Sequence, residues 1–244
     1  MYVITDQTPR ASAAVEIIIV VAIALFSRWV LLQYFWRYAG PVSLVAMLAL
    51  LTVYLGRRGE TWRDYGLVSL KSAKSKWLLF PQIALTFAAF VAAILLTAKL
   101  GVALGFEFMG ERPSGVEDRW GAIEGNLPML LLWLGIVWTA AAFGEEMFFR
   151  GYLITRLQTV FAGIRFGSAL SVLIPALIFG FGHVYYQGLK GFIVTGAIAV
   201  AFGTVFLLFK RNLWPTIFLH GAIDSLGMII IYLGAGGVDA NISL

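Results

Sequence analysis

The stretch PMLLLWLGIVWTAAAFGEEMFF, residues 128–149, decides the fold class of this protein. As a helix it is long enough to cross the hydrocarbon core of a bilayer, which is about 30 Å thick. Its only charged residues are the adjacent Glu145 and Glu146. Carboxylates inside a membrane helix are costly to bury and usually serve a site. The stretch therefore predicts a membrane span that carries functional side chains.

The whole chain shares this apolar character. Of its 244 residues, 60% are hydrophobic and 13% are charged, and the mean hydropathy is +0.87. A soluble domain could not build a water-facing surface from this composition. The net charge of +5 does not indicate nucleic-acid binding, because the basic residues flank apolar runs, where lipid headgroups explain them. Since the chain has no cysteine, a catalyst would have to use oxygen or imidazole groups.

We predict an all-α fold, a polytopic transmembrane helical bundle of about seven spans, or eight, with a polar active-site cavity within the membrane. The expected spans are 13–36, 41–56, 78–100, 128–149, 168–187, 191–209 and 213–234. Pro175 lies inside the fifth of them, where a proline kinks a helix. We divide this single membrane domain into N-terminal spans with a basic loop (1–124), a core (125–232) and a C-terminal tail (233–244).

The loops differ in charge. Residues 57–76 are rich in lysine and arginine, whereas residues 101–127 are rich in glutamate and aspartate. Because cytoplasmic loops carry the excess of basic residues, we expect 57–76 and the N-terminus to lie in the cytoplasm. The protein is then a multi-pass protein of a cell membrane, and the compact, membrane-only chain favours a prokaryotic source.

A pair of glutamates begins the first of three polar motifs. Glu146 and Arg150 are four residues apart, so on a helix they face each other and their charges can pair. Glu145 points about 100° away and is left free. We therefore expect Glu146 and Arg150 to act as a structural clamp and Glu145 to be available for chemistry. Arg28, inside the first span, is expected to snorkel or to be paired.

The other two motifs contain the only two histidines of the chain. Phe179 and His183 are four residues apart, as are His220 and Asp224, so each pair shares a helix face. Residues 146 and 183 are symmetric about a turn-like segment, 161–167, so antiparallel helices would bring the glutamates level with His183. The same reasoning leaves His183 and His220 out of register by about 15 Å. A kinked or broken fifth helix, or a tilted sixth, is needed to bring them together.

Taken in order, Glu145-Glu146-xxx-Arg150, Phe179-xxx-His183 and His220-xxx-Asp224 resemble the three motifs of the CPBP family. This family comprises the type II CAAX prenyl endopeptidases and prokaryotic relatives that include bacteriocin-processing and bacteriocin-immunity proteins, also called Abi proteins. The resemblance covers about residues 125–232. The stretch Trp62–Leu67 also resembles a short segment that these proteins often carry ahead of the core.

The resemblance implies an intramembrane endopeptidase in which Glu145 and His183 activate a water molecule. A desolvated carboxylate held by an imidazole can accept a proton from water as the water attacks a peptide carbonyl, without an acyl-enzyme. His220 would stabilise the oxyanion. Asp224 stands where the eukaryotic enzymes carry Asn, and we expect it to orient His220 or the water, or to remain protonated. Glu146, Arg150 and Phe179 are the expected supporting residues.

Metal dependence and the class of activity both have alternatives. Glu145, His183, His220 and Asp224 could also bind a divalent ion such as zinc, which would make the protein a metalloprotease. The sequence lacks a His-Glu-xx-His motif, so we favour a reaction without a cofactor. The expected partners are the lipid bilayer and a membrane-delivered or lipid-modified peptide. A non-enzymatic immunity or scaffold protein and a transporter with a proton relay are the rival classes, but the complete set of polar residues favours an enzyme.

Overall fold

The computed structural model describes residues 9–111 and 113–234, and this part of the chain is helical without strands. The predicted C-terminal tail therefore lies outside the described residues from 235 onward. The α-helices are α1 (Arg10–Phe35), α2 (Ala39–Arg57), α3 (Ala73–Ile94), α4 (Leu100–Ala103), α5 (Ser114–Trp120), α6 (Leu127–Ile136), α7 (Thr155–Val160), α8 (Gly167–Phe181), α9 (Val184–Leu208) and α10 (Trp214–Tyr232). Short 3₁₀ helices are η2 (Glu107–Met109) and η3 (Gly121–Ile123), and wider π-helical turns form η1 (Leu95–Lys99) and η4 (Val137–Ile154).

Within the described residues, six helices are long and apolar enough to cross a membrane. They are Arg10–Phe35, Ala39–Arg57, Ala73–Ala103, Leu127–Val160, Val184–Leu208 and Trp214–Tyr232. Each corresponds to one of the predicted spans, so the multi-pass architecture is confirmed for these six. The long helix Leu127–Val160 joins α6, η4 and α7 and carries the glutamate pair. π-helical turns such as those of η4 are rare and often occur at functional sites.

The predicted fifth span, 168–187, was too long. Its helix, α8, has only 15 residues and ends at Phe181. The chain bends at His183, and α9 is broken again at Gly188, where φ is +60° and ψ is −155°. Pro175 lies inside α8, and glycine gives the chain the backbone freedom that these bends require. The helix α8 is therefore shorter than a full span, and His183 lies beyond its end.

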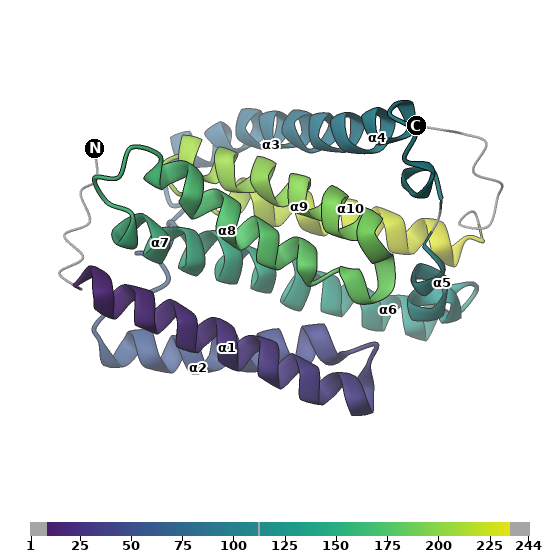
Figure 1. Ribbon diagram of the computed structural model, residues 1–244, viewed down its shortest axis with the longest axis horizontal. Coiled ribbons are helices and arrows are strands. Elements are labelled where there is room, and N and C mark those ends of the chain that lie inside the picture. Colours follow the sequence, from purple (N-terminus) through teal and green to yellow (C-terminus); the bar gives the residue numbers. More distant parts are fainter. Residues whose placement is uncertain (1–8, 112, 235–244) are drawn as a thin grey trace.

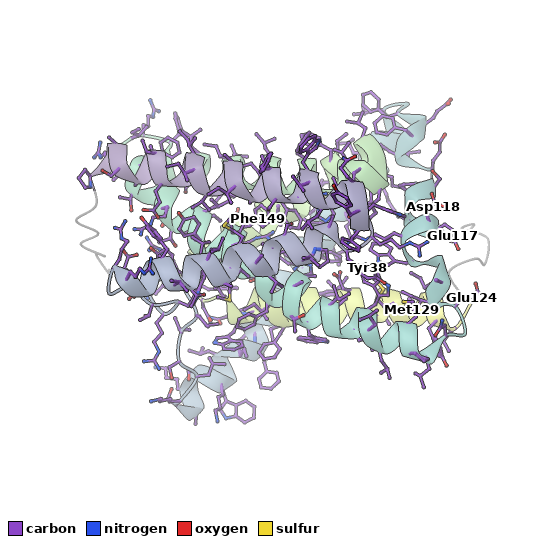
Figure 2. The ribbon with its side chains drawn as sticks, turned by 90° about the horizontal axis from the view of Figure 1, so that it is seen from below. Tyr38, Glu117, Asp118, Glu124, Met129 and Phe149 are labelled. Carbon is purple, nitrogen blue, oxygen red and sulfur yellow. The ribbon has the colours of Figure 1, made fainter. Side chains whose placement is uncertain are left out.

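The helices run back and forth in one bundle. Figure 1 shows α1 and α2 along one edge, α3 and α4 along the opposite edge, and α6 to α10 between them. In Figure 2, the acidic residues Glu117, Asp118 and Glu124 lie at one end of the bundle. The basic loop between α2 and α3 lies at the other end, because α2 leads away from the end where α5 lies. This separation of charge fits the predicted orientation, which stays a prediction.

A buried ionic cluster ties α1 to the C-terminal half of the chain. The Arg156 guanidinium, on α7, donates to Glu16 of α1 at 2.9 Å and to Glu60 at 2.8 Å. The Tyr152 hydroxyl donates to Glu16 at 2.8 Å. The Tyr65 hydroxyl donates to Glu60, and burial raises the pKa of Tyr65 above its usual value, so it remains a neutral donor. The sequence signal that we did not use was Glu16, a lone acid inside an apolar run.

The segment Trp62–Leu67 docks the basic loop onto this half of the bundle. The Trp62 indole donates to the Thr52 hydroxyl at 2.9 Å, and the backbone N–H of Leu213 donates to the Gly66 carbonyl at 3.0 Å. Gly66 has φ +102°, and a Cβ added there would lie 2.4 Å from the carbonyl oxygen of Arg211. Glycine is required at this position both for its backbone conformation and for the close approach.

We expect Gly66→Ala to destabilise the protein by about 2 to 4 kcal/mol, because it adds a steric clash to an unfavourable backbone conformation. The matched control is Gly59→Ala. Gly59 also has a positive φ, +74°, but a Cβ there meets nothing within 4 Å, so its cost should be only about 1 to 2 kcal/mol. Thermal unfolding in detergent measures both variants. Equal stability of the two would show that the contact with Arg211 contributes nothing.

Candidate active site

The polar motifs meet in one cavity inside the bundle. It has a volume of about 440 Å³ and is lined from α1, α2, α3, α5, α6, η4, α8, α9 and α10. Its lining includes every polar residue that the three motifs predicted for the site: Glu145, Glu146, Arg150, His183, His220 and Asp224. Both histidines line this cavity, and α8 ends early, at Phe181, which is the break in the fifth helix that the register argument required.

Glu146 lies at the centre of the hydrogen-bond network. Its side chain has no exposed surface, and its Oε1 accepts from Arg150 at 3.0 Å, which confirms the predicted pair. The same oxygen lies 3.0 Å from Nδ1 of His220, a contact that the sequence did not predict. The Arg150 guanidinium also lies 4.9 Å from the centre of the Phe179 ring. Glu146 therefore holds the side chains of two different motifs in place.

Glu145 remains available, as the helix geometry predicted. Its side chain is 23% exposed and borders the cavity, in contrast to the fully buried Glu146. Its Oε2 lies 3.9 Å from Nε2 of His220. This distance is longer than a hydrogen bond, so the carboxylate can interact electrostatically with the imidazole and still accept a proton from a small molecule in the cavity.

His183 is held by the backbone of its own motif. Its Nδ1 lies 2.8 Å from the carbonyl oxygen of Phe179, and the two rings are 4.6 Å apart. Because a carbonyl oxygen can only accept, Nδ1 carries the proton and Nε2 keeps a free lone pair. The hydrogen bonds of the described residues do not include one between His183 and Glu145. A water molecule between them would have an acceptor on each side.

His220 and Asp224 are neighbours on α10. Nε2 of His220 lies 3.4 Å from Oδ2 of Asp224, and the two side chains are 14% and 35% exposed. Asp224 is thus close enough to orient the imidazole, one of the roles expected for it. The three carboxylates of Glu145, Glu146 and Asp224 surround a single imidazole, so the charges of the site depend on one another.

The alternative metal set was tested against the same geometry. Over residues 9–111 and 113–234, no three His, Asp or Glu side chains are grouped so that they could hold one metal ion. Glu145, His183, His220 and Asp224 line one cavity without converging on a common point of coordination. We therefore assign no step of the reaction to a metal.

Two arginines of the cavity were not predicted as site residues. Arg28 donates to the backbone carbonyl of Gly182, so it is paired, in agreement with one of the expectations for it. Arg119, which the sequence placed in an acidic outer loop, is only 8% exposed and donates to the Tyr185 hydroxyl. No spacing in the sequence links α5 to the start of α9, so this contact could be found only in the structure.

Comparison with family models gives the class of protein. Residues 127–226 match the model of the family described as "Type II CAAX prenyl endopeptidase Rce1-like". Searches of curated proteins and of solved structures gave no match. Residues 127–226 therefore carry a domain similar to the type II CAAX prenyl endopeptidases of the CPBP family, the family that the motifs indicated. The family that this domain matches is one of peptidases.

Proposed function

We propose that the protein is an intramembrane endopeptidase that uses Glu145 and His183 to activate water for hydrolysis of a peptide bond. The observation that carries the proposal is the contrast between the two glutamates in one cavity. Glu146 is fully buried and paired with Arg150, whereas Glu145 is exposed to the cavity at 23%. A general base must be both desolvated and accessible to water, and Glu145 meets both requirements.

The reaction needs two proton transfers. The lone pair of His183 Nε2 accepts a hydrogen bond from water and so positions it, while Glu145 takes a proton as the water oxygen attacks the carbonyl carbon. The tetrahedral intermediate then collapses, the C–N bond breaks, and Glu145 returns the proton to the leaving amine. Water is consumed, and a carboxylic acid and an amine are formed; transfer of the remaining carboxyl proton to the amine gives a carboxylate and an ammonium group.

His220 is suited to stabilise the oxyanion. To donate from Nε2, the ring must carry a proton there, and it must also keep the proton on Nδ1, because Nδ1 faces the Glu146 carboxylate at 3.0 Å. With both nitrogens protonated, the ring is a cation. The carboxylates of Glu146 and Asp224 favour that charged form of the ring by electrostatic attraction. Asp224, when ionised, cannot donate to an oxyanion itself, so we assign it the orientation of His220.

The substrate that we propose is a membrane-delivered or lipid-modified peptide. Most side chains that line the cavity are apolar, and they come from helices long enough to lie within a bilayer. The test is cleavage of a quenched library of lipid-modified and unmodified peptides by the purified protein. Cleavage by the parent protein supports an endopeptidase. No cleavage by demonstrably folded protein would favour the immunity or scaffold role.

We expect chelation of divalent metals to leave this cleavage unchanged, because the proposed proton transfers use only side chains of the chain and water. The measurement is the cleavage rate after incubation with a strong chelator and dialysis, compared with an untreated sample. Loss of the activity with chelator and its recovery with zinc would contradict metal independence. Those results would instead favour the alternative in which Glu145, His183, His220 and Asp224 bind an ion.

A further inference from the structure

One wall of the cavity contains two arginines that the proposed reaction does not use. Arg28, from α1, and Arg119, from α5, both border the cavity. The guanidinium of Arg28 lies 4.6 Å from the centre of the Tyr185 ring, and Arg119 donates to the hydroxyl of the same tyrosine. The two cations therefore lie on the same aromatic side chain, although they come from distant parts of the sequence.

Neither cation has an acidic partner. The ion pairs of the described residues include no carboxylate within 4.0 Å of Arg28 or Arg119. Their Nε atoms are buried without a hydrogen-bond partner, as is the indole nitrogen of the adjacent Trp120. Buried donors of this kind are almost always satisfied, and charged ones are usually paired. The positive charge that Arg28 and Arg119 bring to the cavity wall is therefore not compensated by a carboxylate of the described residues, which favours an anion as the ligand of this cavity.

The arginines are close to the proposed reaction centre. The Tyr186 ring is 5.8 Å from the His183 ring and 4.5 Å from the guanidinium carbon of Arg119. That guanidinium is therefore at most about 10 Å from His183, a distance that a few residues of extended peptide span. Arg28 donates to the carbonyl of Gly182, the residue before His183.

We propose that Arg28 and Arg119 form an anion subsite that binds a carboxylate of the peptide substrate within a few residues of the bond that is cleaved. This inference rests on the proposed endopeptidase function and adds a specificity determinant to it. A carboxylate has two oxygens, which match the fork of donors on a guanidinium. The carboxylate is either that of the C-terminus or that of an acidic side chain.

A close contact fixes the position of Arg119. Gly115, on the same short helix, packs so tightly on the α9 backbone that a Cβ would lie 2.5 Å from the carbonyl oxygen of Tyr186. This contact holds α5 over the start of α9 and keeps Arg119 inside the cavity, where it is 8% exposed. A headgroup phosphate at the bilayer surface would have less access to such a buried cation than a peptide bound in the cavity.

Binding of a short fluorescent S-farnesyl peptide to the Glu145→Gln protein in detergent tests the subsite without turnover. The peptide is made as a free acid, as a C-terminal amide, and as an amide with one acidic side chain near the C-terminus. We expect at least one carboxylate form to bind about ten- to a hundredfold more tightly than the plain amide. The form that binds tightly identifies the source of the carboxylate.

The variants Arg119→Gln and Arg28→Gln should each remove most of this preference, whereas Arg165→Gln, a change on an exposed loop, should keep it. The subsite would be overturned if the protein with both arginines bound the acid and amide peptides with equal affinity. This result does not depend on whether the arginine variants fold. If phosphatidylglycerol then displaced both peptides, the cations would be assigned to a lipid headgroup instead. Cleavage of the same peptides by the parent protein is measured separately, so failure of the proposed function is distinguished from failure of the subsite.

Discussion

Glu145→Gln is expected to lower kcat/KM for peptide cleavage by about a hundred- to ten-thousandfold while the protein stays folded. Glutamine has nearly the same shape as glutamate, but its amide cannot accept a proton from water. Glu145 lies 3.9 Å from His220, beyond hydrogen-bond distance, and Arg150 pairs with Glu146, so the variant keeps the hydrogen bonds and the buried ion pair that hold the site together. The measurement is the cleavage rate of the best library peptide together with the unfolding temperature of each protein.

The matched control is Glu124→Gln, which removes a carboxylate of the same kind from an exposed position at one end of the bundle (Figure 2). Glu124 does not border the cavity, so this variant should cleave at the rate of the parent. Equal activity of Glu145→Gln and the parent would exclude Glu145 as the general base. His183→Ala provides a second test, because loss of Nε2 should lower the rate without changing the pair formed by Glu146 and Arg150.

The helical architecture could be predicted because the bilayer constrains it strongly. An apolar run of about 20 residues has one favourable structure in hydrocarbon, a helix, so six spans were predicted, although some of their ends were not: the helix predicted as 128–149 continues to Val160, and the one predicted from 191 begins at Val184. The hairpin between α7 and α8 was predicted from Gly163 and Gly167 in the turn-like segment, and the helices indeed end at Val160 and begin at Gly167. Helix periodicity was also sufficient to separate the roles expected for Glu145 and Glu146.

The sequence could not predict contacts that depend on how helices bend and pack. No proline and no Asp, Glu, Lys or Arg interrupts 182–187, so the end of α8 at Phe181 was missed, and with it the position of His183 between two helices. The bond between Glu146 and His220 joins residues 74 positions apart and depends on that packing. Arg119 was assigned to an outer loop from the acidic residues around it, because local composition contains no information about the distant Tyr185.

Arg150→Ala is expected to destabilise the protein by about 3 to 5 kcal/mol, the largest stability effect that we predict. Arg150 and Glu146 have side chains that are 2% and 0% exposed, so removal of the guanidinium leaves a buried carboxylate without its ion-pair partner. The cation also lies 4.9 Å from the Phe179 ring and 5.3 Å from the Phe202 ring, and both contacts are lost. Thermal unfolding and the recovered folded fraction in detergent measure the effect.

The double variant Glu146→Gln with Arg150→Met tests this explanation. It removes both charges and keeps most of the side-chain volume, so it should recover much of the stability that Arg150→Ala loses. Its activity should stay low, because His220 then faces a neutral amide in place of the carboxylate at 3.0 Å. A double variant as unstable as Arg150→Ala would show that packing against the aromatic rings, and not the unpaired charge, determines the cost. Recovery of stability without recovery of cleavage would instead separate the structural role of the pair from its role in orienting His220.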